Sequence, residues 1–279
     1  MRELFLKLFA MSHFNTGIKV TAFSVPHIVY LVLIFGGIVA AGLILRNKSM
    51  ETKDKVLRIL AYALVISYLS DFFMHDFVYG EMNMDKLPFH ICTVMCPLVA
   101  FAQFNKRFKK FLEPITAVAI VGPLMYLCYP ASIGEGEPWC YQAVQTMFFH
   151  GVELAWGILN ITTKKVEFKM KNIWHSAVLL VAITLWAKLG NEMLGNNWFF
   201  LQEDAFYIGL VGSGILPQWS LMILNPIAVF LVVLAVYGIY YGVNALIKNA
   251  SSKTVTPVAA TIVAEVAATE AQPTDEKQE

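Results

Sequence analysis

The sequence predicts an all-α fold: a polytopic membrane protein with a bundle of about seven transmembrane helices. Its 279 residues are 57% hydrophobic and only 15% charged, and the mean hydropathy is +0.59. Soluble domains are nearer half apolar and a quarter charged. The apolar residues also fall in long uninterrupted runs, and a helix needs about 20 of them to cross a bilayer. Both observations place the excess apolar surface in lipid.

Seven apolar segments follow one another along the chain. They are residues 27–45, 56–79, 88–104, 112–129, 141–161, 173–194 and 219–247. The second segment is interrupted by Asp71, His75 and Asp76, and the third begins with a proline and a histidine. The last is longer than a bilayer requires, so we expect it to tilt or to continue past the membrane.

Basic residues predict the orientation of the bundle, because cytoplasmic loops carry an excess of Lys and Arg. The loops after the first, third, fifth and seventh segments hold most of the 21 basic residues. The opposite loops and the N-terminus hold only Arg2, Lys7, Lys19 and Lys86. We therefore expect the N-terminus outside and the C-terminus in the cytoplasm, in a protein of the cell membrane.

Composition divides the chain into three parts. Residues 1–25 form an N-terminal segment whose stretch RELFLKLFAMSHF indicates an interfacial helix on the outer leaflet or, alternatively, a frayed end. Residues 26–250 form the seven-helix transmembrane domain. Residues 251–279 lack the aromatic content of a core, so we expect a disordered cytoplasmic tail. Between the last two segments, residues 196–218 are apolar and are expected to dip into the membrane face or cap the bundle.

Ionisable groups inside a membrane helix are costly, so each one is a functional candidate. The predicted topology puts Asp71, His90 and Cys92 in the outer halves of their helices and His150 near the midplane. Lys188 and Asn191 lie in an outer half as well. We expect these groups to converge in one polar pocket that faces the outer leaflet, with a membrane phospholipid as its ligand.

Each of these residues also has a structural interpretation. A buried cysteine is more often a small hydrophobe than a nucleophile, and a histidine often only bridges two membrane helices. Lys188 and Glu192 stand four residues apart and can neutralise each other. Cys128 and Cys140 flank one outer loop, which would allow an extracytoplasmic disulfide.

Three motifs resemble those of the YwaF-like family of bacterial integral membrane proteins. They are KLPFHICTV (LP-x-H-x-C), FFHGVELAW (Phe-x-His-Gly) and NEMLGNNWFFLQED (Asn-x-x-x-Gly-x-Asn-aromatic-x-Phe-Leu). They occur in the family's order, from Leu87 to the last segment. Eukaryotic relatives of this family include a cysteine-dependent acyltransferase of ether phospholipids. The resemblance implies a seven-helix, lipid-facing bundle in which His90 and His150 match the two family histidines.

The sequence departs from the eukaryotic pattern at the nucleophile. There the cysteine immediately precedes the matched histidine, whereas here Phe89 holds that position and Cys92 follows His90 by two residues. On a helix, side chains two positions apart in the sequence point about 200° away from each other. His90 is therefore poorly placed to activate Cys92. His150, from another helix, is then the expected base.

Three functions remain open. The first is a Cys/His-dependent lipid acyltransferase or lipid hydrolase. Its predicted catalytic residues are His90, His150, Cys92 and Asp71, and its predicted substrate-binding residues are Asn191, Asn197 and Lys188. The second is a non-enzymatic transporter, receptor or lipid-binding protein.

The third is a metal site, because imidazole and carboxylate groups suit zinc or iron. Its ligands would be His75, His90, His150 and Asp71. No spacing enforces this site, so we predict neither a metal nor a cofactor. The net charge of +1 gives no sign of nucleic-acid binding.

Overall fold

A computed structural model describes residues 17–80, 82–130, 133, 137–202, 211 and 213–270, with the side chains of 78, 79 and 250–270 left out. Every regular element in this part of the chain is helical, which confirms the all-α class. The seven α-helices are α2 (Val25–Leu45), α3 (Met50–Tyr79), α4 (Ile91–Phe104), α5 (Leu112–Cys128), α6 (Tyr141–Thr162), α7 (Ile173–Leu194) and α8 (Leu221–Glu270). One helix occupies each of the seven predicted segments.

Five segments are long and apolar enough to cross a membrane: α2, α3, α7, α8, and α5 together with the 3₁₀ helix that precedes it, over Lys106–Cys128. Helix α4 is apolar but has only 14 residues, and α6 does not meet the criterion although it has 22. The spanning helices carry exposed apolar side chains, such as Val32, Leu33 and Val39 of α2. Such continuous apolar surface is rare on soluble proteins and is typical of contact with lipid.

Local signals fix several helix ends. Pro26 stands in the first turn of α2, where its missing N–H costs nothing. The Ser49 side chain accepts a hydrogen bond from the Thr52 N–H at 3.3 Å and caps α3. Gly80 ends α3 with a φ of 77°, a left-handed conformation that glycine adopts without strain.

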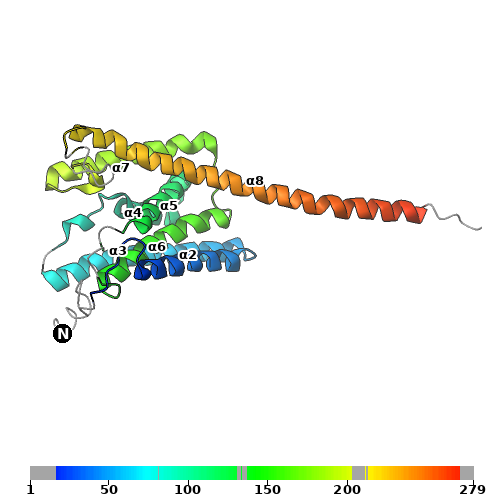
Figure 1. The fold of residues 1–279 in the computed structure, drawn as a ribbon, viewed down its shortest axis with the longest axis horizontal. Coiled ribbons are helices and arrows are strands. Elements are labelled where there is room, and N and C mark those ends of the chain that lie inside the picture. The colour runs from blue at the N-terminus through cyan, green and yellow to red at the C-terminus, as the bar shows by residue number, and fades with distance from the viewer. Residues whose placement is uncertain are drawn as a thin grey trace, which may run out of the picture. The chain divides into compact units, whose positions relative to one another are not determined.

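Helix α6 lies in the interior of the bundle, in contact with α2, α3 and α5 (Figure 1). Its buried residues include Gln145, Thr146, His150, Glu153 and Asn160. Because neighbouring helices cover these side chains, they do not face lipid. The polarity that keeps α6 from qualifying as a span by itself therefore belongs to the core of the bundle.

Close helix contacts around α6 depend on glycine. A Cβ atom on Gly151 would lie 3.0 Å from a side-chain carbon of Ile34 in α2, and one on Gly157 would lie 2.7 Å from Ile120 in α5. Small residues allow membrane helices to approach one another in this way. The same contacts bring the polar side chains of α6 close to its neighbours.

We call the two ends of the bundle the His90 end and the Asp54 end. At the His90 end, α3, α5 and α7 end and α4 and α6 begin. At the Asp54 end, α4 and α6 end and α3, α5 and α7 begin, and a network of polar side chains joins the helices. There Asp54 Oδ1 accepts hydrogen bonds from Lys165 Nζ at 2.5 Å and from Gln103 Nε2 at 3.2 Å, and Trp156 Nε1 donates to Gln103 Oε1 at 3.1 Å.

The chain divides into two compact units, residues 1–234 and 235–279. Helix α8 begins in the first unit and runs in the second as far as Glu270, beyond the predicted end of the transmembrane domain at residue 250. The disorder predicted for residues 251–279 stays a prediction. The predicted interfacial helix in residues 2–14, and residues 203–210 and 212 of the loop expected to dip into the membrane, lie outside the described residues.

Candidate functional site

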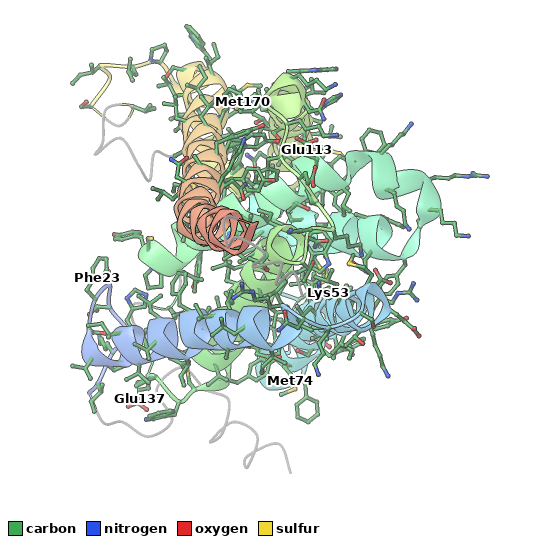
Figure 2. All side chains as sticks on the ribbon, turned by 90° about the vertical axis from the view of Figure 1, so that its right-hand side faces the viewer. Phe23, Lys53, Met74, Glu113, Glu137 and Met170 are labelled. Atoms are coloured by element: carbon green, nitrogen blue, oxygen red, sulfur yellow. The ribbon has the colours of Figure 1, made fainter. Side chains whose placement is uncertain are left out.

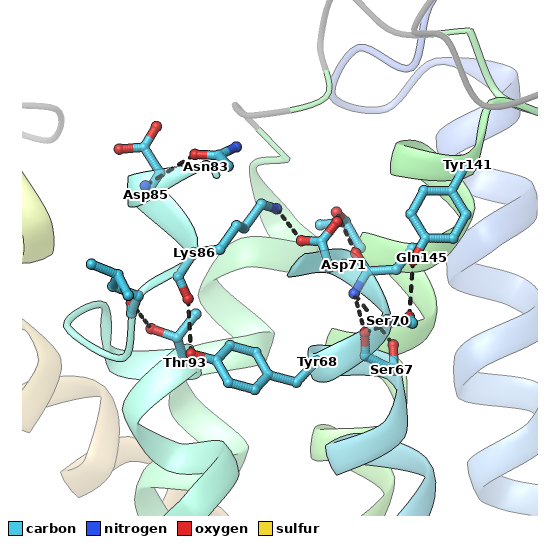
Figure 3. Close-up of polar contacts among 12 residues, drawn as sticks. Ser67, Tyr68, Ser70, Asp71, Asn83, Asp85, Lys86, Thr93, Tyr141 and Gln145 are labelled. Carbon is cyan, nitrogen blue, oxygen red and sulfur yellow. Dashed lines mark hydrogen bonds and ion pairs between the residues drawn. The ribbon is translucent and has the colours of Figure 1, made fainter. Parts of the chain in front are cut away.

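An ion pair holds the segment before α4 against α3 at the His90 end (Figure 3). Lys86 Nζ lies 2.8 Å from Asp71 Oδ2, and both side chains are mostly buried. The Tyr68 hydroxyl donates a hydrogen bond to the Lys86 carbonyl at 2.8 Å. The carboxylate of Asp71, a predicted catalytic residue, is thus placed against a lysine.

His90 is the N-cap residue of α4, and its ring contacts the loop that follows α7. Its Nδ1 accepts a hydrogen bond from the Phe199 N–H at 3.2 Å. Since Nδ1 is the acceptor, the proton of the neutral ring is on Nε2. One ring nitrogen of His90 is therefore committed to positioning backbone.

The backbone that His90 holds is strained. Phe199 has φ 56° and Phe200 has φ 53°, a left-handed conformation that costs roughly 1–2 kcal/mol for each residue with a side chain. Asn225 of α8 clamps the same turn, because its Nδ2 donates to the carbonyls of Phe199 at 2.9 Å and Phe200 at 3.0 Å. His90 and Asn225 together stabilise a turn that would otherwise relax.

The predicted substrate-binding residues of α7 and its loop make structural contacts. Asn191 pairs its side-chain amide with the Trp198 backbone: Nδ2 donates to the carbonyl at 3.0 Å, and Oδ1 accepts from the N–H at 2.7 Å. Asn197 Oδ1 accepts from the Gln202 N–H at 2.8 Å. Lys188 forms an ion pair with Glu192 on an exposed side of α7, as in the structural interpretation.

Phe89 fills the position at which the eukaryotic relatives carry their cysteine. Its ring lies between Trp186, with a centroid distance of 5.0 Å, and Trp198, at 4.5 Å. On its remaining side it packs on Gly190, where a Cβ atom would be 2.5 Å from the ring. This position is therefore an aromatic packing site.

His150 of α6 has the arrangement of a general base. Its Nδ1 is 2.8 Å from the Thr146 carbonyl, and because a carbonyl only accepts, Nδ1 carries the proton. The lone pair is then on Nε2, which is buried and has no hydrogen-bond partner among the described residues. The ring stacks on Tyr126 with a centroid distance of 3.8 Å, which fixes its orientation.

His27 shows what a purely structural histidine looks like in this bundle. Its Nε2 is 2.8 Å from the Leu127 carbonyl of α5, and its Nδ1 accepts from the Phe23 N–H at 2.8 Å. Both ring nitrogens are satisfied, so His27 bridges two helices. His150 differs because one nitrogen is left available for another group.

Glu153 was not among the predicted site residues, although it stands three residues from His150 on the same side of α6. Its side chain is fully buried, and neither carboxylate oxygen has a hydrogen-bond partner in the described part of the chain. It interacts electrostatically with the thiols of Cys92 and Cys96 in α4. Because an ionised, unpartnered carboxylate is very costly to bury, we expect Glu153 to carry a proton.

Cys92 lies in the first turn of α4 and is a half-buried free thiol. Cys92 makes no described hydrogen bond to His90 or His150. The structure thus brings Cys92 near Glu153, which is one turn from His150 on α6.

Cys96, Cys128 and Cys140 are also free thiols, so the disulfide that Cys128 and Cys140 would allow is not formed. The metal alternative gains no support, because within the described residues no three His, Cys, Asp or Glu side chains gather in a way that would hold an ion.

Comparison with known proteins gives one match. The family model of the TMEM164 family covers residues 22–247, a range that includes α2 to α7 and the first half of α8. No curated protein and no solved structure matches the chain. A YwaF-like relationship and acyltransferase activity stay predictions.

Proposed function

Because this chain belongs to the TMEM164 family of multi-pass membrane proteins, we propose for it a membrane-embedded reaction on phospholipid acyl chains. In this proposal it is a lipid acyltransferase or lipid hydrolase, with Cys92 as nucleophile and His150 as base. The observation that carries the proposal is the buried Nε2 of His150, which has a lone pair and no partner.

The chemistry follows from these groups. His150 Nε2 accepts the thiol proton, and the Cys92 thiolate attacks the carbonyl carbon of a lipid ester. The tetrahedral intermediate collapses with cleavage of the ester C–O bond, and the alcohol leaves with the proton from His150. The acyl group remains on Cys92 as a thioester, until water or a second lipid hydroxyl attacks it with His150 again as base.

Two further features support this reaction. The N–H groups at the start of α4 and a protonated Glu153 are hydrogen-bond donors of the kind that stabilise an oxyanion. The contacts of Asp71, His90 and Asn191 fix the segments around the site. We assign them to positioning.

The topology completes the proposal. The lysines and arginines that gather at the Asp54 end support a cytoplasmic location for that end. A polar pocket near His150 would then open toward the outer leaflet of the cell membrane, with a phospholipid as its substrate.

Purified protein in proteoliposomes tests this function directly. A phospholipid with a labelled acyl chain is supplied together with a lysophospholipid acceptor, and labelled lipids and hydroxylamine-sensitive label on the protein are measured. We expect Cys92→Ser to abolish both signals and His150→Ala to reduce turnover at least a hundredfold. Cys96→Ser is the matched control and should retain activity. If Cys92→Ser and His150→Ala each leave lipid remodelling unchanged, the proposal fails.

A second candidate function is non-enzymatic lipid binding. It is favoured by one observation: Cys92 has no described hydrogen bond to either histidine. In this case the same proteoliposomes would show no acyl transfer by the wild type. Purified protein would retain a co-purifying phospholipid, and Cys92→Ser would retain it equally well.

A further inference from the structure

A short basic turn joins α4 to α5 at the Asp54 end. It is the 3₁₀ helix η2 (Lys106–Phe111), with the sequence KRFKKF. The side chains of Lys106, Arg107, Lys109 and Lys110 are all exposed. In the part of the chain that the structure describes, no ion pair includes any of the four. The turn therefore presents four cations that are not neutralised by described carboxylates.

Aromatic rings lie among these cations. Phe108 stacks on Phe101 of α4 with a centroid distance of 5.3 Å, and Lys110 Nζ lies 4.9 Å from the centre of the Phe111 ring. Phe101 and Phe111 are both exposed. A binding site for a soluble polyanion does not require exposed aromatic rings. At the membrane interface, by contrast, aromatic and cationic side chains are favoured next to each other.

The lengths of the adjoining helices place this turn at the depth of lipid headgroups. Helix α4 has 14 residues and is only about 21 Å long at a rise of ~1.5 Å per residue, shorter than the ~30 Å hydrocarbon core of a bilayer. Helix α5 reaches the length of a span only together with η2, over Lys106–Cys128. The turn η2 is therefore the end of a span and lies close to the phosphate layer.

A second basic loop borders the turn. Glu113, two residues after η2, accepts hydrogen bonds from the Lys169 N–H at 2.7 Å and from Asn172 Nδ2 at 2.6 Å. Figure 2 shows Met170 next to Glu113. The exposed side chains of Lys169 and Lys171 thus extend the positive surface beside α5.

We propose that η2 is a binding site for the headgroup of an anionic phospholipid in the leaflet at the Asp54 end. The four cations bind the phosphate and its additional negative charge, while Phe108 and Phe111 lie against the upper acyl chains. Each basic residue near an anionic surface contributes favourably to this attraction. The site is separate from Cys92 and His150, and it does not depend on the proposed acyl transfer.

Native mass spectrometry of the full chain in detergent tests the site, with phosphatidylglycerol and phosphatidylcholine of identical acyl chains as the two probes. We expect the wild type to retain phosphatidylglycerol preferentially. The variant Lys106→Gln/Arg107→Gln/Lys109→Gln/Lys110→Gln should lose about tenfold or more in apparent affinity for it, with affinity for phosphatidylcholine unchanged. The double variants Lys106→Gln/Arg107→Gln and Lys109→Gln/Lys110→Gln provide the same test if the quadruple variant folds poorly.

A matched control neutralises four cations at the same end of the bundle but outside η2: Arg46→Gln/Lys48→Gln/Lys53→Gln/Lys55→Gln. It should keep most of the preference for phosphatidylglycerol. An equal loss in this control would show that only net charge matters and would overturn the site. So would equal retention of both lipids by the wild type, or displacement of phosphatidylglycerol by equimolar soluble glycerophosphoglycerol.

Discussion

Substitution of Gly190 by alanine tests the aromatic packing that precedes His90. The new Cβ atom would lie 2.5 Å from Phe89 Cδ1, roughly 1 Å inside an ordinary carbon–carbon contact of ~3.5 Å. The Phe89 ring is held between Trp186 and Trp198, so it cannot move aside easily. Overpacking of this kind costs about 1–3 kcal/mol, and alanine returns up to ~1 kcal/mol in the helix. We expect a net loss of about 1–2 kcal/mol.

Thermal unfolding of the purified protein in detergent measures this effect. Gly190→Ala should lower Tm by a few degrees, and Phe89→Leu in the same chain should recover part of the loss by making room. Gly36→Ala is the matched control, because no heavy atom lies within 4 Å of its added Cβ. It should be neutral or slightly stabilising. If Gly190→Ala behaves like Gly36→Ala, the packing described for Phe89 is wrong.

Three other predictions follow from the buried polar groups. Lys86→Met leaves the Asp71 carboxylate buried without its partner and should cost about 3 kcal/mol of unfolding free energy. The double variant Lys86→Met/Asp71→Leu should restore most of this loss. A single variant as stable as the wild type would contradict the ion pair. Asn225→Leu removes both side-chain hydrogen bonds to the strained turn and should lower the free energy of unfolding by about 2–3 kcal/mol. Proteolysis between residues 197 and 202 should become faster. Unchanged proteolysis would mean that the turn does not need these hydrogen bonds. Glu153→Leu should raise Tm, because it removes a polar group without a described partner from the core. Acyl transfer should fall in the same variant. A lower Tm would show that Glu153 has a structural partner.

Hydropathy was sufficient to locate one helix in each predicted segment, because a helix in a membrane needs a long run of apolar residues. It could not separate helices that face lipid from one that other helices cover. The segment that became α6 is apolar over much of its length, yet its polar residues lie inside the bundle. Which neighbours cover a helix depends on packing between distant segments, and one sequence does not contain that information.

The candidate site likewise has features that the sequence indicates and features that only the packing determines. The sequence indicated that polar groups of α3, α4, α6 and α7 gather in one pocket, and that pocket stays a prediction. It did not show that Asp71 pairs with Lys86 or that His90 supports residue 199, because those partners are 15 and 109 positions away. Glu153 stands three residues after His150 in the sequence. That its carboxylate has no hydrogen-bond partner among the described residues depends on how the helices pack, which the spacing does not reveal.

The interior position of α6 has a consequence for the biogenesis of the protein. A segment with buried glutamine, histidine and glutamate is a poor substrate for insertion by itself, since each polar group near the bilayer centre opposes partitioning into lipid. Helices α2, α3 and α5, which contact α6, are all synthesised before it. They are therefore available to cover its polar side chains, and we expect the insertion of α6 to depend on its packing against them.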